Sequence, residues 1–177
     1  MPKKLKRDYK AVYKHLDETR PVTGFDVSFR LEDAEELSRG LDLLPPNPVG
    51  LTIGSHLGAS DYFMCTYRPD LTMYSLDCSP TPKWLFNLQG LKAIQLTGMS
   101  DTYEWDKPID LLFVDGDHSC QWCRHDLTRF IPFVKDNGII AGHDYDIETV
   151  SLVVDKLLLP YKKLAASHSY VYQKCSP

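Results

Sequence analysis

Hydrophobic and polar residues follow two different patterns along the chain. Up to about residue 48 the pattern predicts two helices, over residues 7–18 and 31–44, and a linker between them. The turn-forming segment TRPVTG is expected to end the first helix. Prolines at positions 45, 46 and 48 are expected to end the second. The apolar residues of the second helix lie close to one helical face: Leu31, Ala34, Leu37, Leu41 and Leu44.

From residue 49 short apolar runs alternate with helical stretches. Strands are predicted over residues 49–53, 71–77, 93–98, 109–115 and 138–144, and helices fit between them, most clearly over 119–134 and 146–159. Two tail runs, 161–166 and 169–173, predict an antiparallel hairpin. Strands separated by helices imply an α/β fold with a doubly wound, mostly parallel sheet. We expect a single domain, 1–177, made of an N-terminal helical extension (1–48) and a core (49–177).

Composition and charge narrow the class of protein. The chain has 177 residues, 43% of them apolar and 25% charged, which is ordinary for one globular domain. A formal charge of −4 gives no general reason to expect nucleic-acid binding, and the short basic opening, residues 2–7, is expected to be a solvated end. No apolar run suits a membrane span or a secretion signal, and five cysteines do not suggest a secreted disulfide framework. We therefore expect a cytoplasmic protein without membrane or nucleic-acid partners; a homo-oligomer stays open.

Polar residues follow several of the predicted strands. In a doubly wound sheet the ligand lies beyond the carboxyl ends of the strands, so the chemistry is expected there. The turn GSHLGAS after the first strand carries Gly54 and Gly58, which allow a sharp bend and a close approach to a ligand. It is neither a G-x-G-x-x-G nor a P-loop sequence. Asp77 ends the second strand, where a carboxylate can accept hydrogen bonds from a ribose. Together these features suggest an adenosine-type ligand.

Several motifs, in order, resemble the class I S-adenosylmethionine-dependent methyltransferases. The segments IGSHLGAS, YSLD and, over residues 110–145, DLLFVDGDHS…DL…FVKDNGIIAGHDY are similar to the small-molecule O-methyltransferase branch that carries a DGDHSY-type segment. The similarity extends over about residues 49–145. It implies a Rossmann-like sheet and an enzyme that transfers a methyl group from S-adenosylmethionine to a small hydroxylated acceptor.

The resemblance also assigns roles to residues. The loop around the methionine moiety would contain Gly54, Ser55, His56, Leu57, Gly58 and Ser60. Asp77 would hold the ribose with Cys78 beside it, and the adenine would be bordered by Met99, Ser100 and Asp101. The loop beneath the methyl-transfer centre would comprise Asp115, Gly116, Asp117 and His118.

A divalent cation assists related O-methyltransferases, and the matching positions here are Asp115, His143 and Asp144. An oxygen-rich set favours Mg²⁺, whereas a histidine shifts the preference towards Mn²⁺ or another transition ion. Without a metal, His143 or His118 would be the general base. Asp115, His143 and His118 are thus the candidate catalytic residues.

Three positions depart from the family pattern. Thr52 stands where an acidic residue usually precedes the first motif, and Cys120 replaces the tyrosine that usually follows DGDHS. The turn before the fifth strand is Asp136-Asn137-Gly138 instead of Pro-Gly-Gly, and asparagine tolerates the left-handed conformation there. Such changes would also suit a non-catalytic cofactor- or partner-binding domain on the same scaffold.

Other residues have competing interpretations. Asp115-Gly116-Asp117 also forms the D-x-D of metal-dependent glycosyltransferases. Cys120 and Cys123 could form a redox pair, but they continue an apolar helical stripe, and Ser119 is expected to cap that helix. Core packing is expected for three aromatic residues, with the lining of the adenine or acceptor pocket as the alternative: Trp84, Phe86 and Trp105. Surface or loop positions are expected for three histidines: His15, His56 and His168.

Overall fold

The computed structural model describes residues 7–25 and 27–175, so most of the basic opening, residues 2–6, lies outside the described part. The elements in chain order are α1 (Tyr9–Thr23), α2 (Leu31–Leu41), β1 (Val49–Ile53), α3 (Ala59–Tyr67), β2 (Thr72–Asp77), α4 (Pro82–Asn87), β3 (Ala93–Thr97), β4 (Ile109–Val114), α5 (Cys120–Phe130), a 3₁₀ turn η1 (Ile131–Phe133), β5 (Val134–Gly142), α6 (Glu148–Leu157), β6 (Lys162–Ala166) and β7 (Tyr170–Gln173).

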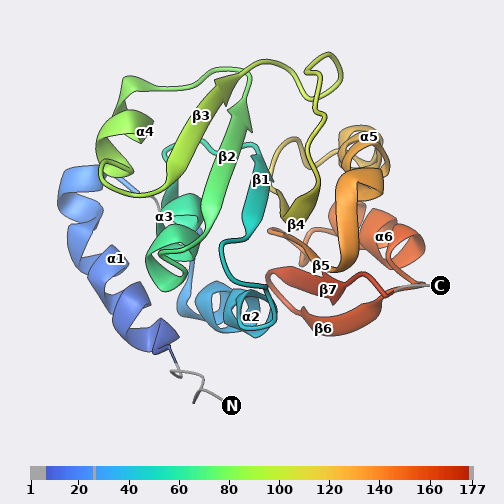
Figure 1. The fold of residues 1–177 in the computed structure, drawn as a ribbon, viewed down its shortest axis with the longest axis horizontal. Coiled ribbons are helices and arrows are strands. Elements are labelled where there is room, and N and C mark those ends of the chain that lie inside the picture. The colour runs from blue at the N-terminus through green and yellow to red at the C-terminus, as the bar shows by residue number, and fades with distance from the viewer. Residues whose placement is uncertain (1–6, 26, 176–177) are drawn as a thin grey trace.

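The strands form one seven-stranded sheet in the order β3-β2-β1-β4-β5-β7-β6 (Figure 1). β1 to β5 pair in parallel, and the C-terminal hairpin adds β7 antiparallel to β5 and to β6. The predicted Rossmann-like, doubly wound sheet with its C-terminal antiparallel hairpin and N-terminal helices is therefore confirmed. The chain moves outward from β1 in one direction and from β4 in the other, so the switch point lies between β1 and β4.

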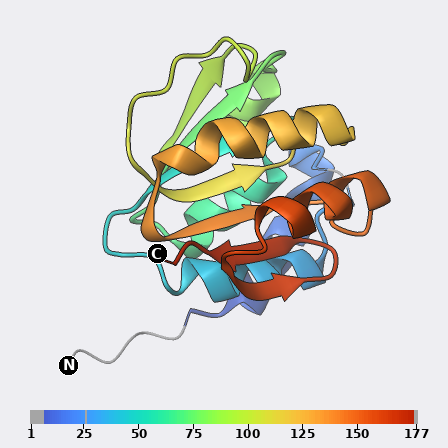
Figure 2. The ribbon, with the colours of Figure 1, turned by 90° about the vertical axis from the view of Figure 1, so that its right-hand side faces the viewer.

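Helices cover both faces of the sheet. One apolar cluster joins α1, α2 and α3 to alternate residues of β4 such as Leu111 and Phe113. A second joins α5 and α6 to the intervening residues Leu112 and Val114. Figure 2 shows α5 and α6 lying over the second face. β4 is buried along its whole length because both of its faces are covered, as its continuous apolar run predicts. In the described part of the chain, no helix has the length and apolar character to cross a membrane.

Several element boundaries differ from the prediction. α5 ends at Phe130, four residues before the predicted end at residue 134, because the 3₁₀ turn η1 follows it. α1 continues through Pro21 to Thr23 and ends at Gly24, whose φ of 69° is left-handed. Pro21 removes one backbone donor near the end of the helix, and the Thr23 hydroxyl donates back to the Thr19 carbonyl over 3.0 Å. α2 stops at Leu41 instead of residue 44. β5 begins at Val134 and passes through Asn137, whose φ of 62° confirms the expected left-handed residue.

The side-chain predictions hold in part. Ser119 caps α5, its Oγ accepting from the backbone N–H of Trp122, and Cys123 is buried in the apolar stripe as expected. Trp84 and Trp105 are core residues, but the core prediction for Phe86 is wrong. His168 lies in the loop between β6 and β7, as predicted, but it is buried there. Phe86 is 58% exposed because it lies on the outer side of the single turn and a half of α4. His168 is 9% exposed because a carboxylate of α2 faces it in the β6–β7 turn.

A buried arginine ties the N-terminal segment to the core. The Arg68 guanidinium, at the end of α3, donates to the carbonyl oxygens of Leu41, Leu44 and Pro45 and pairs with Asp70. These carbonyls lie where α2 has ended and the proline segment begins, so they lack helical donors. The planar, multi-donor guanidinium can serve all of them at once. Arg68 therefore fixes the path of the segment that connects α2 to β1.

Replacing Arg68 by methionine, Arg68→Met, should lower the free energy of unfolding by about 3 kcal/mol, because buried carbonyls lose their donor. Urea denaturation followed by circular dichroism measures this. The matched control is Arg39→Met, which removes a half-exposed arginine paired with Glu35 over 3.1 Å. The control should change stability by less than about 0.5 kcal/mol. Equal losses in the two variants would contradict this role for Arg68.

Candidate active site

The carboxyl ends of β1, β2, β4 and β5 bring most of the predicted residues to one edge of the sheet. Two cavities of about 370 and 330 Å³ lie there. They adjoin each other because Gly54, His56 and Asp115 line both. Cavities of this size suit small ligands and cofactors. The first cavity extends over the ends of β2 and β3, and the second extends towards β5 and the N-terminal helices.

The structure gathers nearly all of the expected residues around these two cavities. The first is lined by Gly54, His56, Asp77, Cys78, Met99, Ser100, Asp115, Gly116 and Asp117. The second is lined by Gly54, Ser55, His56, Leu57, Gly58, Ser60, Asp115, His118, His143 and Asp144. Asp101 lines neither cavity and is exposed in the turn after Ser100.

The glycine turn after β1 is held by the acid at the end of β2. Asp77 Oδ2 accepts hydrogen bonds from the backbone N–H groups of Ser55 and His56, both at 3.0 Å, and Asp77 Oδ1 accepts from Ser79 N at 2.8 Å. A carboxylate has about four acceptor positions, so three are occupied and about one remains for a ligand. Gly54 and Gly58 have φ angles of 80° and 87°, which favour glycine. Asp77 therefore shapes the loop and also faces the first cavity.

Thr52, which stands where the family pattern has an acidic residue, contacts a buried acid from another element. The Thr52 hydroxyl donates to Asp61 Oδ1 over 2.6 Å, and Asp61 Oδ2 accepts from Ser75 Oγ at 2.6 Å and Trp84 Nε1 at 3.3 Å. Asp61 is fully buried on α3, and burial raises the pKa of its carboxyl group. The acidic group beneath the glycine turn thus comes from α3 instead of β1, and its three donors join β1, β2 and α4.

Two histidines and two aspartates converge in the second cavity. Asp144 Oδ2 lies 2.8 Å from His118 Nε2 and 3.1 Å from His143 Nδ1. Asp115 Oδ1 lies 3.9 Å from each of these nitrogens. The His118 side chain is 45% exposed and the His143 side chain 4%. His118 can therefore reach a ligand from solvent, whereas His143 meets the cavity only through Nδ1.

Burial and charge shift the pKa values in this cluster. Burial raises the pKa of Asp115, whereas the hydrogen bond from His143 lowers the pKa of Asp144. For His143, burial opposes the charged form, but the interactions with the Asp144 and Asp33 carboxylates outweigh it and raise the pKa to about 10. Interaction with Asp115, and then the Asp144 charge, raises the pKa of His118. Such perturbed groups in a cavity are typical of functional sites.

Several residues that line the cavities were not predicted from the sequence. Trp122 and Asp126 of α5 line the first, and Ser28 and Phe29, between α1 and α2, line the second. Asp126 is buried, and its Oδ1 accepts from Ser100 Oγ at 2.6 Å. Asp126 stands next to Leu127 of the apolar helical stripe, and an aspartate at such a position is a signal that could have indicated its role. Nothing in the local pattern pointed to residues 28 and 29, which reach the site through the packing of α1 and α2.

The sheet order, the glycine turn at the switch point and the acid after β2 define an α/β domain that binds an adenosine-type cofactor. The chain belongs to the methyltransferase domain family, whose model matches residues 51–145. The protein is accordingly an S-adenosylmethionine-dependent methyltransferase, as the motif resemblance predicted. No curated protein sequence matches the chain.

Solved methyltransferase structures share this fold. MycE from the mycinamycin biosynthetic pathway, in complex with Mg, SAH and mycinamycin VI, superposes with a TM-score of 0.69 at 15% identity, over 97% of this chain and 55% of that chain. A putative caffeoyl-CoA O-methyltransferase from Staphylococcus aureus gives 0.62 at 14% identity, over 91% of each chain. The N-methyltransferase NodS from Bradyrhizobium japonicum WM9 gives 0.57 at 12% identity, over 80% of this chain and 93% of that chain. This chain thus spans about half of the MycE chain.

Proposed function

We propose that the protein transfers the methyl group of S-adenosylmethionine to a hydroxyl group of a small acceptor, with help from a divalent cation. The observation that carries the proposal is the convergence of Asp115, His118, His143 and Asp144 in the second cavity, directly beside the glycine turn. A hydroxyl acceptor must lose a proton, and carboxylates and imidazoles at this position can assist that loss. Residues 1–48 and 49–177 would then act as extension and core of one catalytic domain.

The first cavity suits the adenosine part of the cofactor. Asp77 has one acceptor position left for a ribose hydroxyl, and Cys78 lies beside it. The methionine part would extend along the turn from Gly54 to Ser60 into the second cavity. When bound, S-adenosylmethionine supplies the methyl group for an in-line displacement. Gly116 and Asp117 line the wall between Asp115 and α5.

The adenine would reach Asp126 at the far end of the first cavity, with Met99 and Ser100 along its border. Ser100 Oγ and His125 Nδ1 lie 2.6 and 3.1 Å from Asp126 Oδ1. In the described part of the chain no hydrogen bond to Asp126 Oδ2 is found. Oδ2 lies beside Gly116, at 3.5 Å from the position a Cβ atom would take there. A buried acceptor at this position suits the exocyclic amino group of adenine.

The donor set in the second cavity fits a divalent cation. Asp115, His143 and Asp144 would hold the ion. The ligand atoms of Asp115, His118 and Asp144 lie within 4.8 Å of one another, so His118 would join or replace His143. Two carboxylates and an imidazole suit Mn²⁺ or another transition ion and also admit Mg²⁺. Such an ion would lower the pKa of an acceptor hydroxyl. The MycE complex with Mg, SAH and a small-molecule acceptor supports the same combination here.

His118 is the group we assign to proton removal, since it is the more exposed of the two histidines. Asp144 Oδ2 fixes the direction of its Nε2. Phe29 and Ser28, from the N-terminal extension, would cover the acceptor and exclude water. The five free cysteines are compatible with the proposed cytoplasmic setting. The absence of nucleic-acid partners stays a prediction, and a homo-oligomer stays open.

Replacing Asp77 by alanine, Asp77→Ala, should weaken binding of S-adenosylhomocysteine about 10- to 100-fold, because a hydrogen bond to a charged group contributes about 1.5–3 kcal/mol. Isothermal titration measures the dissociation constant. Asp101→Ala is the control, because Asp101 lies outside both cavities, and its constant should stay within about twofold. Wild-type protein that fails to bind the ligand would refute the proposed function.

Asp126 should select adenine over hypoxanthine. A carboxylate accepts from the amino group of adenine but repels the carbonyl oxygen of hypoxanthine. Wild-type protein should therefore bind S-adenosylhomocysteine at least about tenfold more tightly than S-inosylhomocysteine, and Asp126→Asn should remove most of this preference. Asp101→Asn should leave it intact. If the ratio of the two dissociation constants is the same in Asp126→Asn as in wild type, Asp126 does not read the base.

Cation binding should depend on Asp115 and Asp144 but not on Asp117. Asp117 Oδ1 accepts from Ser119 N over 2.7 Å and lies outside the groups of ligand atoms that could share an ion. Electron paramagnetic resonance should detect Mn²⁺ bound to wild type and to Asp117→Asn, with a loss of at least about tenfold in affinity in Asp144→Ala and Asp115→Ala. In a D-x-D glycosyltransferase Asp117→Asn would lose the ion instead, and that result would favour the alternative enzyme class.

A further inference from the structure

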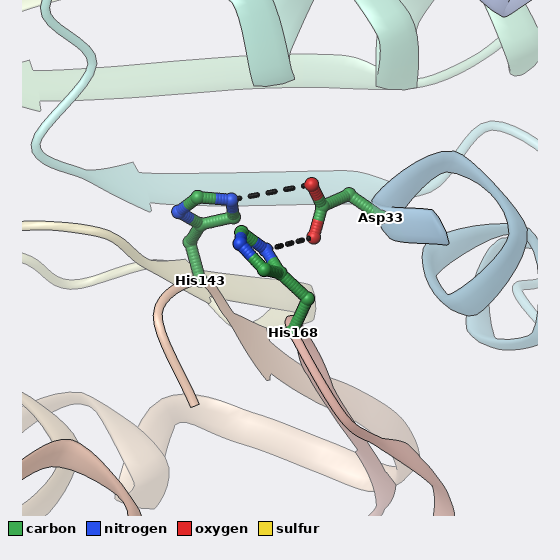
Figure 3. A group of neighbouring side chains, drawn as sticks. All are labelled: Asp33, His143 and His168. Atoms are coloured by element: carbon green, nitrogen blue, oxygen red, sulfur yellow. Dashed lines mark hydrogen bonds and ion pairs between the residues drawn. The ribbon is translucent and has the colours of Figure 1, made fainter. Parts of the chain in front are cut away.

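A buried carboxylate from the N-terminal extension lies directly behind the catalytic cluster. Asp33, in the first turn of α2, is fully buried, and Glu36 one turn later is nearly so. Both point towards the β6–β7 turn at the end of the sheet, where Ser167, His168 and Ser169 lie. Figure 3 shows the Asp33 carboxylate between two imidazoles, with one oxygen directed at each. Asp33 is separated from both histidines by more than a hundred residues of sequence.

Four groups surround the Asp33 carboxylate. Oδ1 lies 2.8 Å from His168 Nδ1 and accepts from Ser169 Oγ at 2.6 Å. Oδ2 accepts from the backbone N–H of Arg30 at 2.7 Å and lies 3.3 Å from His143 Nε2. An ionised carboxylate has about four acceptor positions and no proton to donate. A proton on the nitrogen of each imidazole that faces Asp33 would therefore complement this carboxylate.

This arrangement orients the ring of His143. Its Nε2 faces Asp33, so Nδ1 is the nitrogen that faces Asp144 and Asp115 in the second cavity. The ring of His168 packs edge-on against it, with centroids 4.6 Å apart. Apart from the ion-pair contact with Asp33, the described residues offer His143 Nε2 no hydrogen-bond partner. Without Asp33 this nitrogen would be buried and unpaired, and the ring would lose the group that fixes its orientation.

We infer that Asp33 is the positioning residue of His143: it keeps the proton on Nε2 and leaves Nδ1 to face the cavity. The inference deepens the proposed function and rests on it, because His143 is one of the proposed cation ligands. Histidines that bind a metal through one nitrogen usually donate the other N–H to a carboxylate or carbonyl, which fixes the ring and its tautomer. The N-terminal extension thereby becomes part of the catalytic machinery.

The same three residues, Asp33, His143 and His168, could be read as a second metal site, since their ligand atoms lie within 4.8 Å of one another. The contacts argue against this. Oδ1 of Asp33 already accepts from Ser169 Oγ, and Oδ2 accepts from Arg30 N. His168 Nδ1 lies at hydrogen-bond distance from Oδ1, and His143 Nε2 lies at ion-pair distance from Oδ2. An ion would have to displace both imidazole protons inside a fully buried cluster. Three hydrogen bonds and one ion pair account for all four contacts.

Glu36 provides a matched control. It is a buried carboxylate on the same helix and accepts from Ser167 Oγ at 2.7 Å and from the backbone N–H of Ser169 at 2.8 Å. Glu36→Gln therefore weakens the same junction between α2 and the β6–β7 turn without touching His143. A purely structural role of Asp33 would give Asp33→Asn and Glu36→Gln the same effects on the site.

The test is nitrogen-15 NMR of the histidine rings in the metal-free full-length protein, followed by Zn²⁺ titration. In wild type and Glu36→Gln, Nε2 of His143 should carry a proton before and after Zn²⁺ addition, whereas Nδ1 should bind the ion and release its proton to the solvent. Asp33→Asn should lose the protected Nε2 proton and weaken Zn²⁺ binding about 10- to 100-fold, while the dissociation constant for S-adenosylhomocysteine stays within about twofold.

Three results would overturn the inference. The first is an unprotonated Nε2 of His143 in the wild-type protein, which is decisive even if Asp33→Asn does not fold. The second is a similar loss of Zn²⁺ affinity in Asp33→Asn and Glu36→Gln. The third is an unchanged His143 spectrum in Asp33→Asn. If wild type binds S-adenosylhomocysteine but no Zn²⁺, the cation part of the proposed function fails, and the ring spectrum still decides the role of Asp33.

Discussion

The close approach of the turn after β1 to the loop after β4 is the constraint on which the site depends. Gly54 has a φ of 80°, and a Cβ atom there would collide with the backbone of Asp115 and Gly116. Only glycine lets the two loops meet at the switch point of the sheet. Their contact brings the glycine turn and the Asp115 carboxylate together. The rest of the site is built outward from this contact.

Carboxylates hold the surrounding elements in register with that contact. Asp61 joins β1, β2 and α4 beneath the glycine turn, and Asp77 holds the turn from the side. Asp33 joins α2 to the end of β5 and to the β6–β7 turn. Each of these acids is surrounded by donors, so little buried polar capacity is left unpaired. The hydrophobic clusters hold the sheet and helices together, and the acids fix the positions of the loops that line the two cavities.

Much of the fold could be predicted from the sequence because its strands are short and nearly continuous in apolar residues. The polar residues that end them, such as Asp77 and Asp115, were predicted at the edge of the sheet because parallel strands end there together. The path of α1 through Pro21 could not be predicted, since local breaker signals favoured a turn. The helix can continue through Pro21 because its last turn tolerates the missing backbone N–H donor of the proline.

The remaining misses concern long-range contacts. His168 looked like a loop histidine, and its burial follows from Asp33, which lies 135 residues away in sequence. Asp61 supplies from α3 the carboxylate that Thr52 lacks on β1. A comparison of motifs reveals only the substitution at position 52. Asp126 was visible as an aspartate in an apolar stripe, but only the folded helix turns it towards the first cavity. In each case the partner is set by packing and leaves no local pattern.

The most direct test of this account is a crystal structure of the protein soaked with S-adenosylhomocysteine and Mn²⁺, with anomalous diffraction used to locate the ion. The account predicts the ribose at Asp77, the adenine beside Asp126 and an anomalous peak between Asp115 and Asp144. Homocysteine should lie along the glycine turn and point at that peak. Ligand density elsewhere on the molecule, or empty cavities at saturating ligand, would contradict the central claim that this sheet edge carries out methyl transfer.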